Sequence, residues 1–276
     1  MNDINMNSEY YKLTEEVKQL KEDIASLYEE KDELVYHICK NIEAEYMSKV
    51  GILEYKLYEF NCKILRLKRK IELYQQKINM QELPDENEIE NKLDKEYSQY
   101  EKKLNSISNT IQKLLYRKNL DFLSEEESRE IKKVYRKLIK KLHPDLTKEN
   151  NKQKEKLLIQ VTNAYKQGDI ETLKNIELLT EEVTEKTNTK DIGLIELREC
   201  KTKYKRIIDE LLESIKKIKE SFPYNQKEFL KSDVLVNKRK EELERDTEQY
   251  KDIYSKLEDI LNQLKGDKNG WYYKNR

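Results

Sequence analysis

The sequence predicts an all-α protein in which long antiparallel coiled-coil hairpins flank a small helical module. Two observations lead to this prediction. Only 5 Gly and 3 Pro occur among 276 residues, and because tight turns depend on these residues, most of the backbone must lie in long uninterrupted elements. Apolar residues also recur at steps of three and four over long stretches, which is typical of a coiled-coil seam.

The first hairpin is predicted over residues 8–115. The seam of its first helix begins with apolar residues at steps of three, four or seven, namely Leu13, Val17, Leu20, Ile24, Leu27, Leu34 and Ile38. The segment Leu83 to Asn87 ends this helix, because it contains Pro84, which has no amide donor. The next helix should fold back antiparallel on the first, so we expect residues near Leu27 to face residues near Leu104.

A second hairpin is predicted over residues 190–265, where two further seams flank a turn at Ser221 to Asn225. Between the hairpins, residues 116–180 follow a different pattern and form the predicted module. The first seam also changes phase near Gly51. Glycine there indicates either a close approach of two helices or a local break, and the sequence leaves both alternatives open.

Charge and cysteine content exclude several classes of protein. The 55 basic and 55 acidic residues cancel, so the whole chain has no net attraction to nucleic acid or to an anionic membrane. Cys39, Cys62 and Cys200 are odd in number and form no CxxC pair, which argues against a disulfide framework and fits a reducing cytosol. The polar start and the lack of a long apolar run lead us to expect a cytoplasmic protein with no membrane partner.

Catalytic, metal and cofactor sites are not indicated. The only histidines are His37 and His143, and neither has the cluster of partners that a metal site or a nucleophile triad needs. No phosphate-binding loop is present. The basic run Lys63 to Lys70 contains seam residues, so we interpret its charges as the solvated flank of a helix. We therefore expect a non-enzymatic protein with no catalytic residue, no metal and no cofactor.

The module begins at Ser124, which is placed to cap a helix whose first turn is acidic. Four residues of this helix share one apolar face, which we expect to be buried: Ile131, Val134, Leu138 and Leu142. The other side is strongly basic, with Lys132, Arg136, Lys137, Lys140 and Lys141. Pro144 stops the helix. A second helix should bury Leu158, Val161 and Tyr165 and end or bend at Gly168.

The stretch from Ile131 to Asp145, IKKVYRKLIKKLHPD, resembles the second helix and the His-Pro-Asp loop of J-domain (DnaJ-type) co-chaperones. The segment Leu157 to Tyr165, LLIQVTNAY, resembles the third helix of that domain. The tripeptide between two matching helices is a far more specific signal than the tripeptide alone. The family's first helix is not visible in the sequence, and we interpret Leu114 to Leu123 as an extension of the first hairpin that replaces it. The module is therefore called J-like.

The resemblance implies a partner and a binding site. J-domains bind a DnaK-type (heat shock protein 70) chaperone and stimulate its ATPase, and by this resemblance His143, Pro144 and Asp145 would be the trigger. The docking residues implied by the resemblance are Lys132, Tyr135, Arg136, Lys137 and Lys141. Physical chemistry agrees with such a role, because a basic stripe steers an acidic partner and a proline-fixed loop loses little entropy on docking.

Three functional hypotheses follow. The leading one is a J-domain-like co-chaperone whose coiled-coil arms bind a client protein or an assembly that the sequence does not identify. The alternative is a non-enzymatic coiled-coil scaffold with a degenerate J-like module, in which His143, Pro144 and Asp145 only stop a helix. Nucleic-acid binding through basic helix faces is a third and weaker hypothesis. The coiled-coil seams also leave open a homo-oligomer.

Overall fold

The computed structural model describes residues 2–118, 124–147, 152–184 and 193–274. These residues form helices and short turns with no strand among them, which confirms the all-α prediction. Contacts between helices divide the chain into two compact units. Unit 1 contains residues 1–41 and 121–225, and unit 2 contains residues 42–120 and 226–276.

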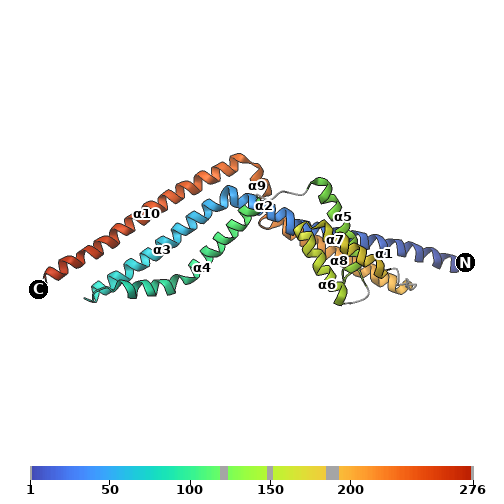
Figure 1. The fold of residues 1–276 in the computed structure, drawn as a ribbon, viewed down its shortest axis with the longest axis horizontal. Helices are drawn as coiled ribbons and strands as arrows, with labels where there is room; N and C mark the ends of the chain where they lie inside the picture. Colours follow the sequence, from blue (N-terminus) through green and yellow to red (C-terminus); the bar gives the residue numbers. More distant parts are fainter. Residues whose placement is uncertain (1, 119–123, 148–151, 185–192, 275–276) are drawn as a thin grey trace. The chain divides into compact units, whose positions relative to one another are not determined.

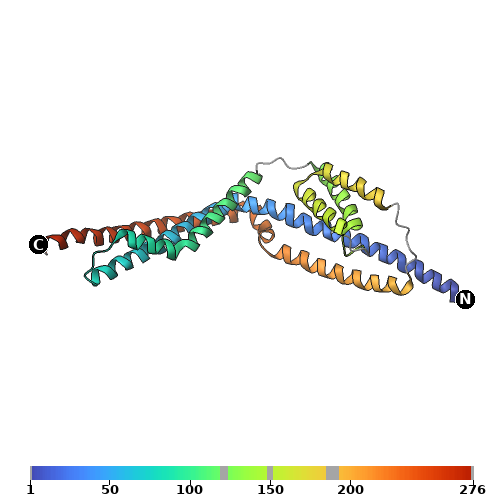
Figure 2. The same ribbon diagram turned by 60° about the horizontal axis from the view of Figure 1, so that its bottom comes forward.

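Unit 1 is built from five helices and a short π-helical segment. They are α1 (Asn2–Glu33), η1 (Leu34–Ile38), α5 (Glu125–Leu142), α6 (Lys152–Gln167), α7 (Ile170–Thr184) and α8 (Leu194–Glu220). Helices α5, α6 and α7 pack against one another. Helix α1 packs along α8 and also against α5, so it runs between α8 and the group of α5 to α7 (Figures 1 and 2).

A single apolar core joins the helices of unit 1. Its most enclosed side chains are Ile24 and Ala25 of α1, together with Tyr135, Leu138, Val161 and Leu173. The predicted apolar face of α5 is confirmed, because Ile131, Val134, Leu138 and Leu142 are all buried. Fully burying one such side chain stabilises a fold by about 1.5–3 kcal/mol. Helix α1 is therefore part of the same core as α5.

Unit 2 contains three long helices, α3 (Ile52–Asn79), α4 (Glu86–Lys118) and α10 (Asp233–Lys274). Its shorter elements are α2 (Cys39–Tyr46), η2 (Met47–Gly51), η3 (Tyr224–Gln226) and α9 (Lys227–Lys231). The first residues of α2 and of η3 belong to unit 1. Helix α3 packs against both α4 and α10 (Figure 1). Tyr74 of α3 and Leu93 of α4 are fully buried in the core, which also includes Leu261 of α10.

The partners of the long helices differ from the prediction. The turn at Pro84 does join two helices that pack together, α3 and α4. However, α8 packs on α1 and α10 packs on α3, whereas the hairpin predicted over residues 190–265 pairs the helices on either side of the turn at Ser221 to Asn225. Leu27 packs against the core of unit 1 and Leu104 belongs to unit 2, so the expected contact between them stays a prediction.

The predicted boundaries of 8–115, 116–180 and 190–265 therefore differ from the two observed units. The reason is physical. Every seam presents the same kind of apolar stripe, and steps of three and four fix which face of a helix is buried without fixing which helix covers it.

The phase change near Gly51 coincides with the π-helical segment η2. A π turn contains an extra residue and so rotates the apolar stripe that follows it. Gly51 is buried, and a Cβ atom at its position would meet the side chain of Met47, one turn earlier in the same segment. The structure therefore favours the local irregularity over a close approach of two helices.

Two further features bear on the sequence predictions. Helix α4 continues to Lys118, so it takes in the first part of the segment Leu114 to Leu123. Residues 119–123, the rest of that segment, lie outside the described residues. Within the described ranges, no helix is both long enough and apolar enough to cross a lipid bilayer.

Candidate functional site

Helix α5 carries most of the predicted site, and its first residues fix where it begins. The Oγ atom of Ser124 accepts a hydrogen bond from the Glu127 amide at 3.2 Å, and the Glu127 carboxylate accepts one from the Ser124 amide at 2.8 Å. This capping box satisfies amide groups that the helix itself leaves unpaired. Acidic residues in the first turn and Lys140 and Lys141 in the last turn complement the helix dipole.

The loop after α5 is held by its own backbone. The amide of His143 donates to the Ile139 carbonyl at 2.9 Å and closes the helix, while the amides of Leu146 and Thr147 donate to the His143 carbonyl at 3.0 and 3.1 Å. The Asp145 amide donates to Nδ1 of His143 at 3.2 Å. Nδ1 therefore acts as an acceptor, which corresponds to a neutral imidazole that carries its proton on Nε2. His143, Pro144 and Asp145 form one compact turn.

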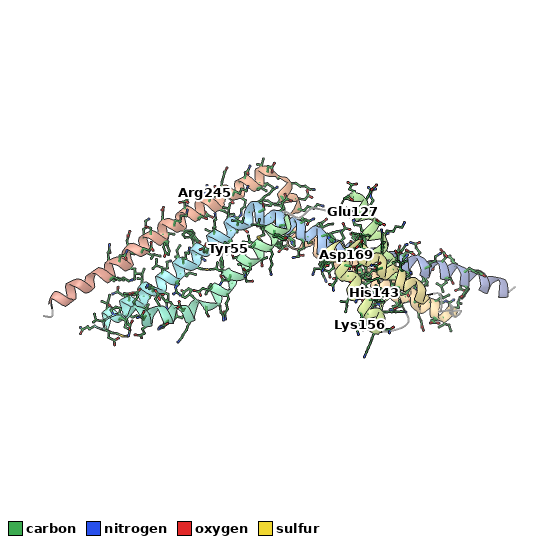
Figure 3. All side chains as sticks on the ribbon, viewed as in Figure 1. Tyr55, Glu127, His143, Lys156, Asp169 and Arg245 are labelled. Carbon is green, nitrogen blue, oxygen red and sulfur yellow. The ribbon has the colours of Figure 1, made fainter. Side chains whose placement is uncertain are left out.

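Helix α1 covers this loop through Tyr28. The Tyr28 ring lies 4.0 Å from the imidazole of His143, centroid to centroid, with the planes inclined by 34°. The Tyr28 hydroxyl donates a 2.6 Å hydrogen bond to Oδ2 of Asp145. From α8, Nζ of Lys203 donates to the Asp145 carbonyl at 3.2 Å. The side chain of His143 is only 16% exposed, that of Asp145 is 39% exposed, and Pro144 is exposed. Figure 3 labels His143 among the side chains of unit 1.

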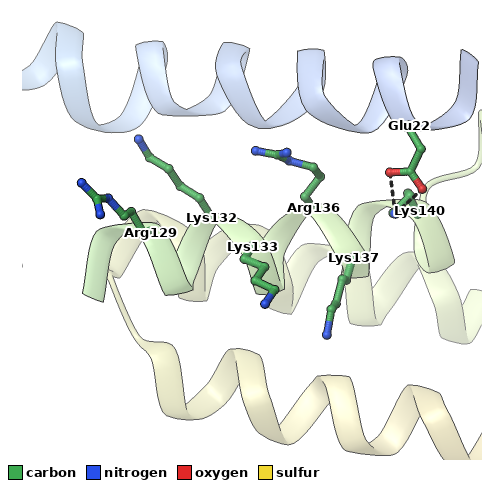
Figure 4. Close-up of a pocket in the computed structure, with 7 residues that line it drawn as sticks. All are labelled: Glu22, Arg129, Lys132, Lys133, Arg136, Lys137 and Lys140. Carbon is green, nitrogen blue, oxygen red and sulfur yellow. Dashed lines mark hydrogen bonds and ion pairs between the residues drawn. The ribbon is translucent and has the colours of Figure 1, made fainter. Parts of the chain in front are cut away.

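The basic side of α5 also faces α1. Three ion pairs connect the helices in antiparallel order: Lys132 with Glu33, Arg136 with Glu29 at 3.0 Å, and Lys140 with Glu22 at 2.6 Å. Figure 4 shows Lys132 and Arg136 directed toward α1, with Lys133 and Lys137 on the other side of α5. Lys137 pairs with Glu177 of α7 at 2.8 Å. We call the pairs with Glu22, Glu29 and Glu33 the α1–α5 ladder.

Tyr135, which the resemblance assigns to docking, is fully buried. Its ring stacks on Tyr165 at 4.0 Å, and its hydroxyl donates to a carboxylate oxygen of Asp32 in α1. The physical reason is spacing, because Tyr135 lies one helical turn from Ile131 and from Leu138 and so extends the buried face. Lys141, also assigned to docking, is partly buried.

The comparison with protein families agrees with this geometry. The family model described as DnaJ domain matches residues 118–167. The chain contains a DnaJ domain. The match takes in α5, the loop with His143 and α6, and it ends before α7 and α8. No curated protein and no solved structure matches the chain. A DnaJ domain is typical of J-domain co-chaperones, whose general partner is an Hsp70-type chaperone.

The contact with α1 changes the electrostatics of the DnaJ domain. Burial is the main cause that lowers the pKa of His143 below its usual 6.5, and the positive charges of Lys31 and Lys203 act in the same direction, while Asp145 opposes them. Burial also raises the pKa of Glu29, against the effect of Arg136. The pKa of Asp32 is raised by burial as well, although the bond from Tyr135 opposes this. The neutral form of His143 is therefore favoured.

Several residues that shape the DnaJ domain site were missed by the sequence analysis. They are Tyr28, Asp32 and Lys203, together with the acidic residues of the ladder. One signal could have identified the ladder: acidic residues at 22, 29 and 33 share a face of α1, and basic residues at 132, 136 and 140 share a face of α5. His37 of η1 lies with Nε2 3.1 Å from the Tyr165 carbonyl.

Proposed function

We propose that this protein is a J-domain co-chaperone that recruits a DnaK-type chaperone and stimulates its ATPase. His143, Pro144 and Asp145 act as the trigger, and Lys132, Arg136, Lys137 and Lys141 dock the chaperone. The observation that carries the proposal is the DnaJ domain match, which falls on a capped basic helix that ends in this tripeptide. The backbone bonds of the loop support a preformed trigger, which loses little entropy on binding.

The helices outside the match are proposed to bind a client protein or an assembly. Unit 2 lies almost entirely outside residues 118–167 and has a core of its own. Such a unit can engage a client while the DnaJ domain engages the chaperone.

A scaffold with an inactive J-like module is the second candidate function. It is favoured by one observation, namely that Tyr28, Lys203 and the acidic residues of the ladder occupy the loop and the basic face. In that case α5 would serve only to hold α1 and α8 in place.

The proposal is tested by the single-turnover ATPase rate of a purified DnaK-type chaperone. Wild-type protein is compared with His143→Gln, which removes the imidazole of the trigger. His37→Gln is a matched control, since it changes the other histidine and keeps an amide that can donate to the Tyr165 carbonyl. A co-chaperone raises the rate, loses this effect in His143→Gln and keeps it in His37→Gln. The scaffold is supported if the chaperone's ATPase rate is unchanged by wild type, by both histidine variants and by a variant that opens the α1–α5 ladder.

A further inference from the structure

Four of the residues that the proposed function requires are contacted by another helix of the same chain, namely Lys132, Arg136, His143 and Asp145. Helix α1 contributes Glu22, Glu29 and Glu33 to the basic side of α5, and Tyr28 to the loop. Helix α1 lies outside residues 118–167, so it is an addition to the DnaJ domain. The contacts fall on the face and on the loop that a chaperone would need.

We infer that α1 is an intramolecular cover that competes with the chaperone for α5 and for His143 and Asp145. The protein is then a latent co-chaperone, and it becomes active when α1 separates from α5. This inference rests on the proposed function, because it describes how the same site is regulated.

Charge complementarity is the first argument for competition. A partner that binds the basic side of α5 must present carboxylates, and α1 already presents them in matching order. Arg136 points its guanidinium at Glu29, whose side chain is only 10% exposed, and Lys132 points its ammonium at Glu33. Each cation is therefore engaged at the position where an acidic partner would bind. Both partners cannot occupy these cations at once.

The loop supplies a second and independent argument. Tyr28 places its ring against His143 and its hydroxyl on the carboxylate of Asp145. Lys203 of α8 holds the backbone carbonyl of Asp145. Two of the three trigger residues are thus in contact with helices outside the DnaJ domain, and Pro144 is the most exposed of the three. A chaperone that contacts His143 and Asp145 must first displace Tyr28.

The polar part of the contact is of a kind that can open. Ion pairs at partly exposed positions contribute about 0–1 kcal/mol each, and Glu29 is held in a buried place where its charged form is disfavoured. Helix α1 is tied to α8 by three further ion pairs, Glu9 with Arg198, Glu16 with Lys201 and Glu30 with Lys219. Separation of α1 from α5 would leave these pairs with α8 in place, and it would expose the core residues Ile24 and Ala25 that α1 shares with α5.

The test uses the full chain with two charge reversals at the ends of the ladder, Glu22→Lys and Glu33→Lys, which keep Glu29 in place. The matched control reverses two other carboxylates of α1, Glu15→Lys and Asp23→Lys. Their side chains bond Lys18 and Gln19 of the same helix. Two readouts are taken: the single-turnover ATPase rate of a purified DnaK-type chaperone, and the pKa of His143 measured by NMR.

The ladder variant is expected to stimulate the ATPase about fivefold or more above wild type, within the range usual for coupled sites. Its His143 pKa should rise toward 6.5, and the control should match wild type in both readouts. If circular dichroism shows that the double reversal loses helicity, the neutral pair Glu22→Gln and Glu33→Gln replaces it.

The failures are distinguishable. Equal stimulation by wild type and by the ladder variant, both above His143→Gln, overturns the cover and leaves the proposed function standing. In the other case neither protein stimulates the ATPase, although the His143 pKa has risen in the ladder variant. This result overturns the proposed function and the cover with it.

Discussion

The aromatic ring of Tyr28 lies 4.0 Å from the imidazole of His143, and the Tyr28 hydroxyl bonds the carboxylate of Asp145. One side chain of α1 therefore contacts both polar residues of the loop. The state of the loop depends on where α1 lies. Each of the first three predictions below follows from a contact of α1 with this loop or with α5.

The titration of His143 should report whether the contact with Tyr28 is closed. Its pKa is lowered from 6.5 mainly by burial, with Lys31 and Lys203 acting in the same direction and Asp145 against them. A lowered pKa means that the closed state binds the proton less tightly than the open state. The closed state therefore keeps its full stability above about pH 6.5. It loses stability as the pH falls from 6.5 toward the lowered pKa that His143 has in the closed state.

We expect NMR titration of wild type to give a His143 pKa below 6.5, and Tyr28→Ala to bring it back toward 6.5 because the imidazole becomes hydrated. Tyr11→Ala is the control, since Tyr11 lies on the same helix and is 67% exposed. A wild-type pKa at or above 6.5 would contradict the closed contact.

Arg136 should matter for stability. The sequence alone predicts that charge reversal at Arg136 and Lys137 is tolerated, on the assumption that this face is solvated. The structure changes that expectation, because Arg136→Glu would place a carboxylate beside the buried Glu29. We expect the free energy of unfolding to fall by about 3 kcal/mol. Lys133→Glu, at an exposed position of the same helix, should change it by no more than about 0.5 kcal/mol. Urea denaturation measures the free energy of unfolding of the two variants. Equal losses in both would argue against the ladder.

Tyr135 tests the buried bond between α5 and α1. Tyr135→Phe keeps the ring on Tyr165 and removes the hydroxyl that donates to Asp32. Asp32 is then left without this donor in a place where burial already raises its pKa, so we expect a loss of about 1–3 kcal/mol. Tyr116→Phe, at a tyrosine that is 71% exposed, is the control. Thermal unfolding that does not distinguish the two variants would rule out the bond.

Leu93 tests the core of unit 2. It is fully buried between α3, α4 and α10, and Leu93→Ala should destabilise this unit by about 2–5 kcal/mol. Leu65→Ala removes the same atoms from a leucine that is 38% exposed and should have a much smaller effect. Hydrogen exchange at the amides of these three helices measures both variants. Similar acceleration in both would mean that Leu93 is not in the core.

Local chemistry made much of the fold predictable. Ser124 caps α5, Pro84 lies in the turn between α3 and α4, and Gly168, with a φ of 73°, follows the end of α6. Each of these depends on residues within a few positions, where side-chain chemistry decides the backbone. The burial of Leu138 and Val161 followed in the same way from the spacing within one helix.

The pairing of helices and the covered state of the site could not be predicted in this way. Leu13 and Val17 form a stripe that suits any apolar helix, and the choice of α8 over α4 depends on the sum of many contacts along the interface. The loop residues His143 and Asp145 were identified from the resemblance, but nothing adjacent to them in the sequence indicates Tyr28. A single tyrosine on a helix becomes significant only when the tertiary structure brings it to the loop.

The pairing of α1 with α8 also has a consequence for biosynthesis. Glu16 and Lys201, which form an ion pair across the two helices, are separated by 185 residues. At a translation rate of about 5–20 residues per second, the first helix emerges from the ribosome roughly 10–40 s before its partner exists. During that interval the stripe of Leu13, Val17 and Ile24 has no native surface to cover it. The apolar stripe of the nascent chain must therefore be protected from aggregation until α8 has been synthesised.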